Sequence, residues 1–314
     1  MSDRAKVLAL HGGLLVLLFA LQFVLPAYHH GNLARIMVLA SFAVGYNVMF
    51  GYAGLLSLGH ALFFAAGMYG MGLAVQHGGA APVPGLLAGI AAALAVSLAV
   101  GLLALRTAGV GFMIVTLMFA QAGYLTILYF GTYTRGDEGL VLQQAQRVLW
   151  GIDLTQPGTR YFAALLLFAV CVLATLAMVR APFGKVLIAI RENEERARML
   201  GYDVFRYKLA AVVISGVISG LAGAVYGLLF GYVGATFASV QYSIFPLLWV
   251  LLGGAGTVLG PFVGTLFMFY LIDLSSAVTS AYMLVAGVAL VLLTLFAPQG
   301  LVGEIRDRIW RWLP

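Results

Sequence analysis

Long apolar runs dominate this chain and constrain its fold more than any other feature. They lie at residues 7–27, 33–50, 61–75, 83–105, 110–130, 161–179, 209–232, 244–252, 258–272 and 282–296. Several reach the roughly 20 residues that a helix needs to cross a bilayer. Only 9% of the residues are charged, against about 25% in an ordinary soluble domain. We therefore predict an all-α, polytopic transmembrane helical bundle in which residues 1–314 form one domain.

The predicted number of membrane segments is about eight to ten. The segments at 244–252 and 258–272 are short and are joined by the sequence GGAGT, so they form either two tilted spans or one re-entrant hairpin. The first segment has the basic start of a signal peptide, but its apolar part is long and the following LPAYHH is a poor cleavage site. We expect it to remain as the first span.

The distribution of lysine and arginine predicts which loops face the cytoplasm. If the N-terminus lies inside and the segments alternate, 13 basic residues lie inside and 4 lie outside. Cytoplasmic loops carry the excess of basic residues in membrane proteins. Both termini and the loop at 180–208 are therefore expected on the cytoplasmic side, and the loop at 131–160 is expected outside.

The loop at 180–208 carries 11 of the 28 charged residues of the chain. Asn193 is a suitable N-cap for a helix, and acidic residues at 194 and 195 are favourable in a first turn. Gly201 is a natural stop at the other end. These signals predict a short, ordered, charged helix on the cytoplasmic face. A solvated loop that merely follows the distribution of basic residues is the alternative.

The tail at 301–314 is predicted to be amphipathic. Its apolar residues at 301, 305, 309 and 312 recur at near-helical spacing, with arginines at 306, 308 and 311 largely away from them. Such a helix favours the inner surface of the membrane. A tail packed against a partner subunit is the alternative.

Two glycine-rich breaks in the apolar pattern resemble each other. The sequence GYAGLLSLGHALFFAAGMY begins at Gly51, and GGAGTVLGPFVGTLFMFY begins at Gly253. Paired, glycine-interrupted segments often mark the substrate region of a transporter. A chance match between glycine-rich strings is the alternative. The candidate translocation-pathway residues in these breaks are Gly54, Ser57, His60, Gly254 and Gly256; for His60, a purely structural role competes with this one.

Several kinds of chemistry are excluded or disfavoured by the sequence. It contains no Walker A, HExxH, CxxC or GxSxG pattern, and its five histidines are scattered. We therefore expect no enzymatic activity, no cofactor and no metal site. The net charge of +6 follows from the basic cytoplasmic loops and does not indicate a nucleic-acid partner. Ionisable residues are almost missing from the apolar segments, which disfavours a stand-alone ion-coupled carrier.

The stretch EERARMLG fits the E-A-A-x-x-x-G signature of ABC importer permeases at Glu195, Ala197 and Gly201, with Arg196 at the middle alanine position. The wider stretch RAPFGKVLIAIRENEERARMLGYDVFRYKL resembles permeases for branched-chain amino acids, of the LivH/LivM family and in particular the LivM type. So do both glycine-rich breaks and RGDEGL at 135–140. The I-x-L-P that follows the signature in many importers reads AVVI at 211–214, which weakens any transfer of geometry from other importer classes.

The resemblance implies the permease subunit of an ATP-driven importer in a bacterial inner membrane. Its implied partners are a second, homologous permease, two cytoplasmic ATPase subunits and a periplasmic solute-binding protein. The implied substrate is a branched-chain amino acid or a similar small polar solute; urea, amides and aromatic acids are the alternatives. A stand-alone secondary carrier or channel is the alternative from another functional class. The residues implied in coupling to the ATPase are Arg191, Glu195, Arg196, Ala197, Arg198 and Gly201. The predicted docking residues for the binding protein are Arg135, Asp137 and Glu138 in the outer loop; ordinary solvated loop charges are the alternative.

Overall fold

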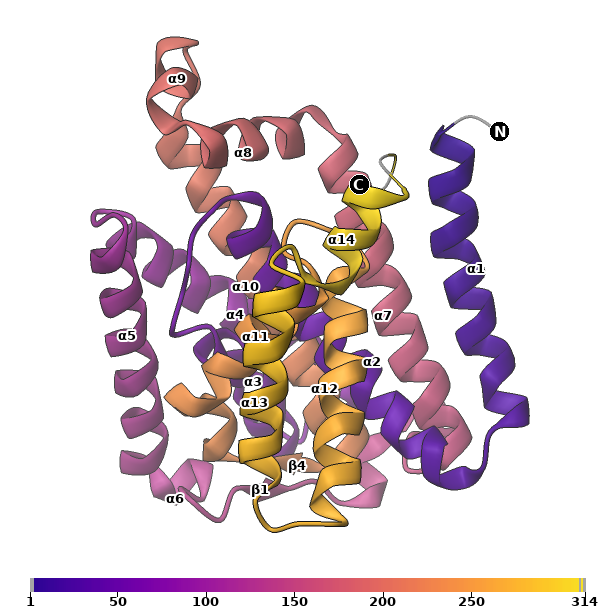
Figure 1. Ribbon diagram of the computed structural model, residues 1–314. Coiled ribbons are helices and arrows are strands. Elements are labelled where there is room, and N and C mark those ends of the chain that lie inside the picture. Colours follow the sequence, from indigo (N-terminus) through magenta and orange to yellow (C-terminus); the bar gives the residue numbers. More distant parts are fainter. Residues whose placement is uncertain (1–2, 311, 313–314) are drawn as a thin grey trace.

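The computed structural model describes residues 3–310 and 312, and nearly all of its regular structure is helical. The α-helices are α1 (Asp3–Val24), α2 (Ala27–Asn47), α3 (Ala61–Gln76), α4 (Pro82–Ala104), α5 (Val110–Tyr129), α6 (Gly131–Thr134), α7 (Pro157–Arg180), α8 (Pro182–Glu192), α9 (Glu194–Met199), α10 (Val204–Phe230), α11 (Val240–Gly253), α12 (Gly260–Ser276), α13 (Tyr282–Phe296) and α14 (Gly300–Arg308). They run mostly side by side as a bundle (Figure 1).

Each of the ten predicted apolar segments coincides over most of its length with one of these helices. Six helices in the described part of the chain are long and apolar enough to cross a membrane: α1, α2, α4, α5, α7 and α10. Four shorter apolar helices, α3, α11, α12 and α13, complete the set of ten. The prediction of an all-α, polytopic membrane bundle is therefore confirmed. The segments at 244–252 and 258–272 belong to two separate helices, α11 and α12, which pack together in antiparallel fashion.

The long helices differ sharply in how much of their surface the bundle covers. The span that contains α2 is 89% buried, whereas the spans of α1 and α5 are each 17% buried. Helix α2 therefore lies at the centre, and α1 and α5 leave apolar side chains for lipid. Close packing against α10 depends on small residues, because a Cβ at Gly67 of α3 would come within 1.9 Å of the carbonyl oxygen of Gly220.

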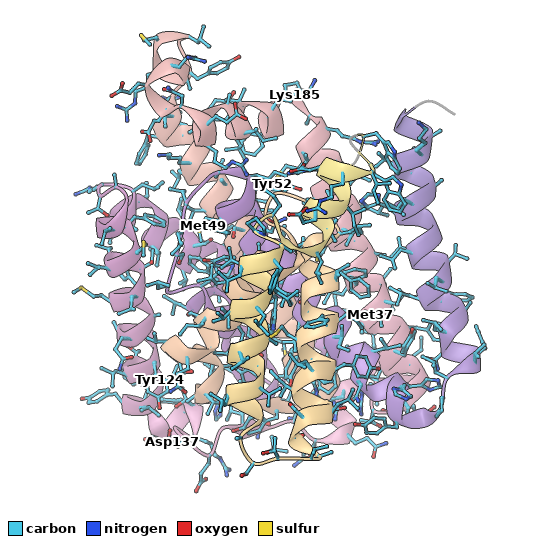
Figure 2. All side chains as sticks on the ribbon, in the orientation of Figure 1. Met37, Met49, Tyr52, Tyr124, Asp137 and Lys185 are labelled. Atoms are coloured by element: carbon cyan, nitrogen blue, oxygen red, sulfur yellow. The ribbon has the colours of Figure 1, made fainter. Side chains whose placement is uncertain are left out.

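The connections divide between the two ends of the bundle. We call them the α9 end, which carries the first turn of α1, α8, α9 and α14, and the α6 end, which carries α6 and residues 131–160 (Figure 1). Lys185 lies at the α9 end and Asp137 at the α6 end (Figure 2). This grouping agrees with the predicted alternation of the segments.

The segment at 131–160 is short of helix but well tied to the bundle. Strand β1 (Leu140–Val141) pairs with β4 (Tyr232–Val233), and β2 (Val148–Leu149) pairs with β3 (Ile152–Asp153), both antiparallel. Because β4 follows α10 directly, the first pair anchors the loop to the end of a long helix.

The C-terminal helix α14 begins at Gly300 and ends at Arg308, so it covers only part of the predicted tail. Val302 and Gly303 are buried, and Gly303 lies against Gly254 in the turn between α11 and α12. Ile305 and Ile309 are exposed. Residues 311, 313 and 314 of the predicted tail lie outside the described residues. Contact of this tail with the membrane surface stays a prediction.

Candidate functional site

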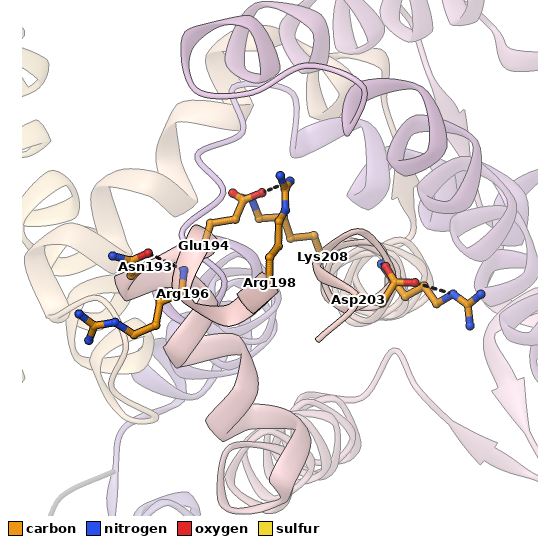
Figure 3. Close-up of polar contacts among 7 residues, drawn as sticks. Asn193, Glu194, Arg196, Arg198, Asp203 and Lys208 are labelled. Atoms are coloured by element: carbon orange, nitrogen blue, oxygen red, sulfur yellow. Dashed lines mark hydrogen bonds and ion pairs between the residues drawn. The ribbon is translucent and has the colours of Figure 1, made fainter. Parts of the chain in front are cut away.

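Helix α9 is a short element with a well-defined start. The backbone breaks at Asn193, with φ −157° and ψ 101°, and its side-chain Oδ1 accepts a hydrogen bond of 2.8 Å from the amide of Arg196 (Figure 3). The carboxylates of Glu194 and Glu195 occupy the first turn, where they stabilise the positive end of the helix dipole. The predicted short, capped helix is confirmed.

Helix α9 is also followed by the glycine that the sequence predicted as its stop. Gly201 has φ +87°, a region that residues with a Cβ rarely adopt. Its amide donates to the carbonyl of Arg198 at 2.9 Å, and the amide of Tyr202 donates to that of Ala197 at 3.2 Å. These bonds satisfy carbonyls that the helix end would otherwise leave free.

Ion pairs tie α9 to the helix that follows it. The carboxylate of Glu194 pairs with Arg198 at 2.7 Å and also with Lys208 on α10. Asp203 caps α10 by accepting from the amide of Arg206 at 3.1 Å, and its carboxylate also pairs with the Arg206 guanidinium at 2.9 Å (Figure 3). The helix is therefore held at a fixed angle to α10 and is not a loose loop.

One face of α9 packs inward and the other is free. Ala197 is buried among Val186, Ile190 and Val204 of the flanking helices. Glu195 and Arg196 are exposed. A pair of apolar side chains, Met199 and Leu200, is 82% and 70% exposed. An exposed apolar pair beside charged groups is the composition of a protein-binding surface.

Arg191 points in a different direction from the other predicted coupling residues. It ends α8, but its guanidinium donates to the carbonyl oxygen of Gly51 in the first glycine-rich break. Its side chain also lies over Gly54, where a Cβ would come within 2.7 Å of the Arg191 Cγ. Arg191 thus joins the α8–α9 segment to the interior of the bundle.

The two glycine-rich breaks that resemble each other in sequence lie in contact. A Cβ at Gly51 would come within 2.5 Å of the amide nitrogen of Gly256. Gly54 and Gly256 close the aligned sequences GYAG and GGAG, and both have a positive φ, of +70° and +72°. The internal similarity therefore extends to the φ angle at this one position.

A buried asparagine clamps these breaks together. The Asn47 side chain donates to the carbonyl of Thr257 at 2.9 Å and accepts from the amide of Gly256 at 2.9 Å. Helix α2 then continues as a π-turn, Val48–Tyr52, which leads into the first break. On the other side, the guanidinium of Arg306 in α14 donates to the carbonyl of Gly256 at 3.3 Å. Two guanidiniums therefore contact the joined breaks, one from α8 and one from α14.

His60 lies deep in the bundle and is fully buried. Its Nε2 is 2.7 Å from the Ser219 hydroxyl of α10, and its ring contacts the rings of Phe42, Tyr46 and Phe63. Ser57 is buried as well, and its hydroxyl accepts from the amide of Gly59 at 3.2 Å. These partners suit a structural role in holding the first break. A role in the translocation pathway stays a prediction.

Comparison with known proteins identifies the family of the chain. Residues 30–295 match the model of a family described as the branched-chain amino acid transport system / permease component. The chain belongs to this permease family.

Three relatives of the permease carry the name LivM. The high-affinity branched-chain amino acid permeases LivM of Escherichia coli and of Salmonella typhimurium are each 28% identical over 301 residues, covering 87% of this chain and 69% of the relative. A probable LivM of Methanocaldococcus jannaschii is 32% identical over 143 residues, covering 40% of this chain and 41% of the relative. No solved structure matches the chain.

The predicted docking residues of the permease lie together at the α6 end, opposite α9. Arg135, Asp137 and Glu138 are all exposed, and no ion pair involves them in the described part of the chain. Arg135 adopts φ +60°, which ends α6 and turns the chain outward.

Sequence reasoning missed an arginine that organises this loop. Arg147 is only 8% exposed, and its guanidinium donates to the carbonyls of Leu228, at 2.7 Å, and of Leu229. It therefore caps the last turn of α10, where basic side chains are favourable. Basic residues are few in the loop predicted to lie outside, so the presence of Arg147 there could have indicated a structural role.

Asp153 holds the second strand pair of the loop. The pKa of its carboxyl is lowered by hydrogen bonds, first from the Thr155 hydroxyl and then from the Thr155 amide and the Gln144 side chain. A lowered pKa means that these bonds stabilise the ionised form, so their contribution is lost as the pH falls through that pKa.

Proposed function

We propose that this chain is one permease subunit of an ATP-driven importer for branched-chain amino acids. The observation that carries the proposal is α9, a capped and braced helix with an exposed face at the end of the bundle opposite the loop at 131–160. The permease has no nucleotide-binding motif, so ATP hydrolysis would belong to two partner subunits that bind this face. A second, homologous permease would complete the pathway across the membrane.

The proposed orientation puts the α9 end, with both chain termini, in the cytoplasm. It rests on the 13 basic residues that this arrangement assigns to the inner side, against 4 on the outer side. Arg135, Asp137 and Glu138 would then face the periplasm, where charged rims give register and speed to the docking of a binding protein.

The proposed coupling element comprises Glu195, Arg196, Ala197, Arg198 and Gly201. An ATPase can bias the permease only if it contacts two states differently. Arg191 supplies a route for that bias, because a shift of α8 and α9 would change its hydrogen bond to Gly51. Gly51 in turn contacts Gly256, so both glycine-rich breaks would move with it.

The importer is tested by reconstitution of the permease pair with its ATPases and binding protein in liposomes. We expect uptake of leucine, isoleucine or valine that requires ATP and the loaded binding protein. Uptake by this chain alone, driven by an ion gradient, would favour a carrier instead. Uptake of urea, an amide or an aromatic acid in place of the branched-chain amino acids would keep the importer and change its substrate.

The route through Arg191 has its own test in the same liposomes. Arg191→Lys keeps the charge but loses the planar, forked guanidinium. We expect ATP hydrolysis to persist while uptake per ATP falls several-fold. Lys185→Ala, on the exposed side of α8, is the control and should leave both rates unchanged. An unchanged ratio in Arg191→Lys would rule out this route.

A further inference from the structure

A cavity of about 360 Å³ lies between α2, α11 and α12. Its wall includes Tyr242, Phe245 and Trp249 from one face of α11, and Phe269, Asp273 and Ser276 from one face of α12. The volume falls within the range of about 300–1,000 Å³ that is usual for small-molecule sites. Because the two helices are antiparallel, Asp273 and Ser276 lie near Tyr242, and Trp249 lies at the other end of the cavity.

Asp273 is the one acidic group in this wall, and its environment is unusual. The hydroxyl of Tyr28 donates to its Oδ2 at 2.6 Å. Among the described residues no lysine, arginine or histidine forms an ion pair with it, and Oδ1 accepts no hydrogen bond. Asp273 lies in the last turn of α12 and is half-exposed, so its carboxylate can be reached from the α6 end.

The rest of the wall suits a cation with an apolar body. Tyr242, Phe245, Trp249 and Phe269 present four aromatic rings, and the rings of Phe245 and Trp249 stack at 5.8 Å. Aromatic faces attract an ammonium group through their quadrupoles, and they also bury aliphatic carbon. A carboxylate beside several aromatic rings is therefore complementary to an organic ammonium ion.

We propose that this cavity is a binding site for a small alkylammonium group, with Asp273 as its counter-ion and the aromatic rings around its side chain. The ligand would enter from the α6 end, with the ammonium group at Asp273 and the aliphatic part directed toward Phe245 and Trp249. This inference rests on the proposed function, because the ligand of the cavity would be the solute that the importer carries.

The test uses protection of a single thiol in membranes that hold the assembled importer. Ser276→Cys in a Cys171→Ala background places the only cysteine of this chain in the cavity wall. Its alkylation by N-ethylmaleimide is timed with three probes that share the branched side chain of leucine. L-Leucine has both charged groups, 3-methylbutylamine has only the ammonium group, and 4-methylpentanoate has only the carboxylate.

We expect leucine and 3-methylbutylamine to slow the alkylation about tenfold when they fill about nine-tenths of the sites. 4-Methylpentanoate should leave the rate unchanged. Asp273→Asn keeps the size and can still accept from Tyr28, but it removes the charge, so it should abolish protection by the amine. Ser280→Cys, exposed and outside the cavity, is the matched control and should react at the same rate with every probe.

Three results would overturn the proposal. The first is that 4-methylpentanoate protects the thiol as well as the amine does. The second is that the amine still protects it in Asp273→Asn. The third is that the amine gives no protection, which is the result expected if a basic side chain of a partner already fills the cavity. The assay needs neither ATP nor a binding protein. An importer that moves another solute would therefore fail the uptake test of the proposed function while protection by 3-methylbutylamine persisted.

Discussion

Gly201 illustrates how a single backbone conformation defines the proposed coupling helix. Its φ of +87° costs a β-branched residue about 1–3 kcal/mol, although a Cβ there would meet no other atom within 4 Å. Gly201→Val should therefore distort the end of α9 while the spans stay inserted. We expect normal membrane levels with loss of most substrate-stimulated ATP hydrolysis and uptake, measured on the same preparation. Gly201→Asn, which tolerates this conformation better, should keep most activity; equal activity in both variants would contradict the argument.

Arg147 acts at the same scale on stability. Its guanidinium satisfies two carbonyls at the end of α10 from a nearly buried position. Hydrogen bonds to charged groups contribute about 1.5–3 kcal/mol, so Arg147→Ala should destabilise the protein by about that amount. Thermal unfolding in detergent would show it as a lower midpoint, with the exposed Arg135→Ala as the control. An unchanged midpoint would mean that water replaces the guanidinium at no cost.

Helix α9 is the element on which the proposed mechanism depends. Glu195 lies in its first turn, is exposed, and forms no ion pair in the described part of the chain. Glu195→Lys would put a cation against the helix dipole, a change of about 0.3–1 kcal/mol, and would reverse the charge offered to a partner. We expect normal insertion but weaker binding of the ATPase, measured by co-purification, and little uptake.

The control for this element is Glu192→Lys, which makes the same charge change in the last turn of α8, outside α9. It should leave both co-purification and uptake near the level of the unmodified protein. If both lysine variants lose co-purification and uptake to the same extent, the net charge of the loop determines ATPase binding and helix α9 does not.

The α6 end and the α9 end of the molecule are predicted to lie on opposite sides of the membrane, and this orientation can be measured. In a Cys171→Ala background, Asp137→Cys and Arg196→Cys place single thiols at the α6 end and the α9 end, both exposed. With the outer membrane permeabilised, a maleimide that cannot cross the inner membrane should label position 137 directly. Position 196 should react only after the inner membrane is opened. The reverse pattern would invert the proposed orientation and move α9 away from any cytoplasmic ATPase.

Local and one-dimensional features could be predicted from the sequence alone. The ten apolar segments follow from the cost of exposing such runs to water, and each coincides over most of its length with one helix. The start and end of α9 follow from interactions within a few residues, namely the Asn193 cap and the positive φ of Gly201. Membership of the permease family likewise follows from the order of motifs along the chain.

Only the tertiary structure determined which distant residues meet. Sequence similarity suggested that the two glycine-rich breaks are related, but their contact through Asn47 depends on how α2, α11 and α12 pack. The hydrogen bond from Arg191 to Gly51 likewise depends on packing, because in sequence and exposure Arg191 resembles its charged neighbours. Three of the four aromatic rings that line the cavity with Asp273 come from helix α11, more than twenty residues earlier in the chain. Hydropathy and helix signals act locally, whereas these contacts follow from the close approach of helices that small residues allow.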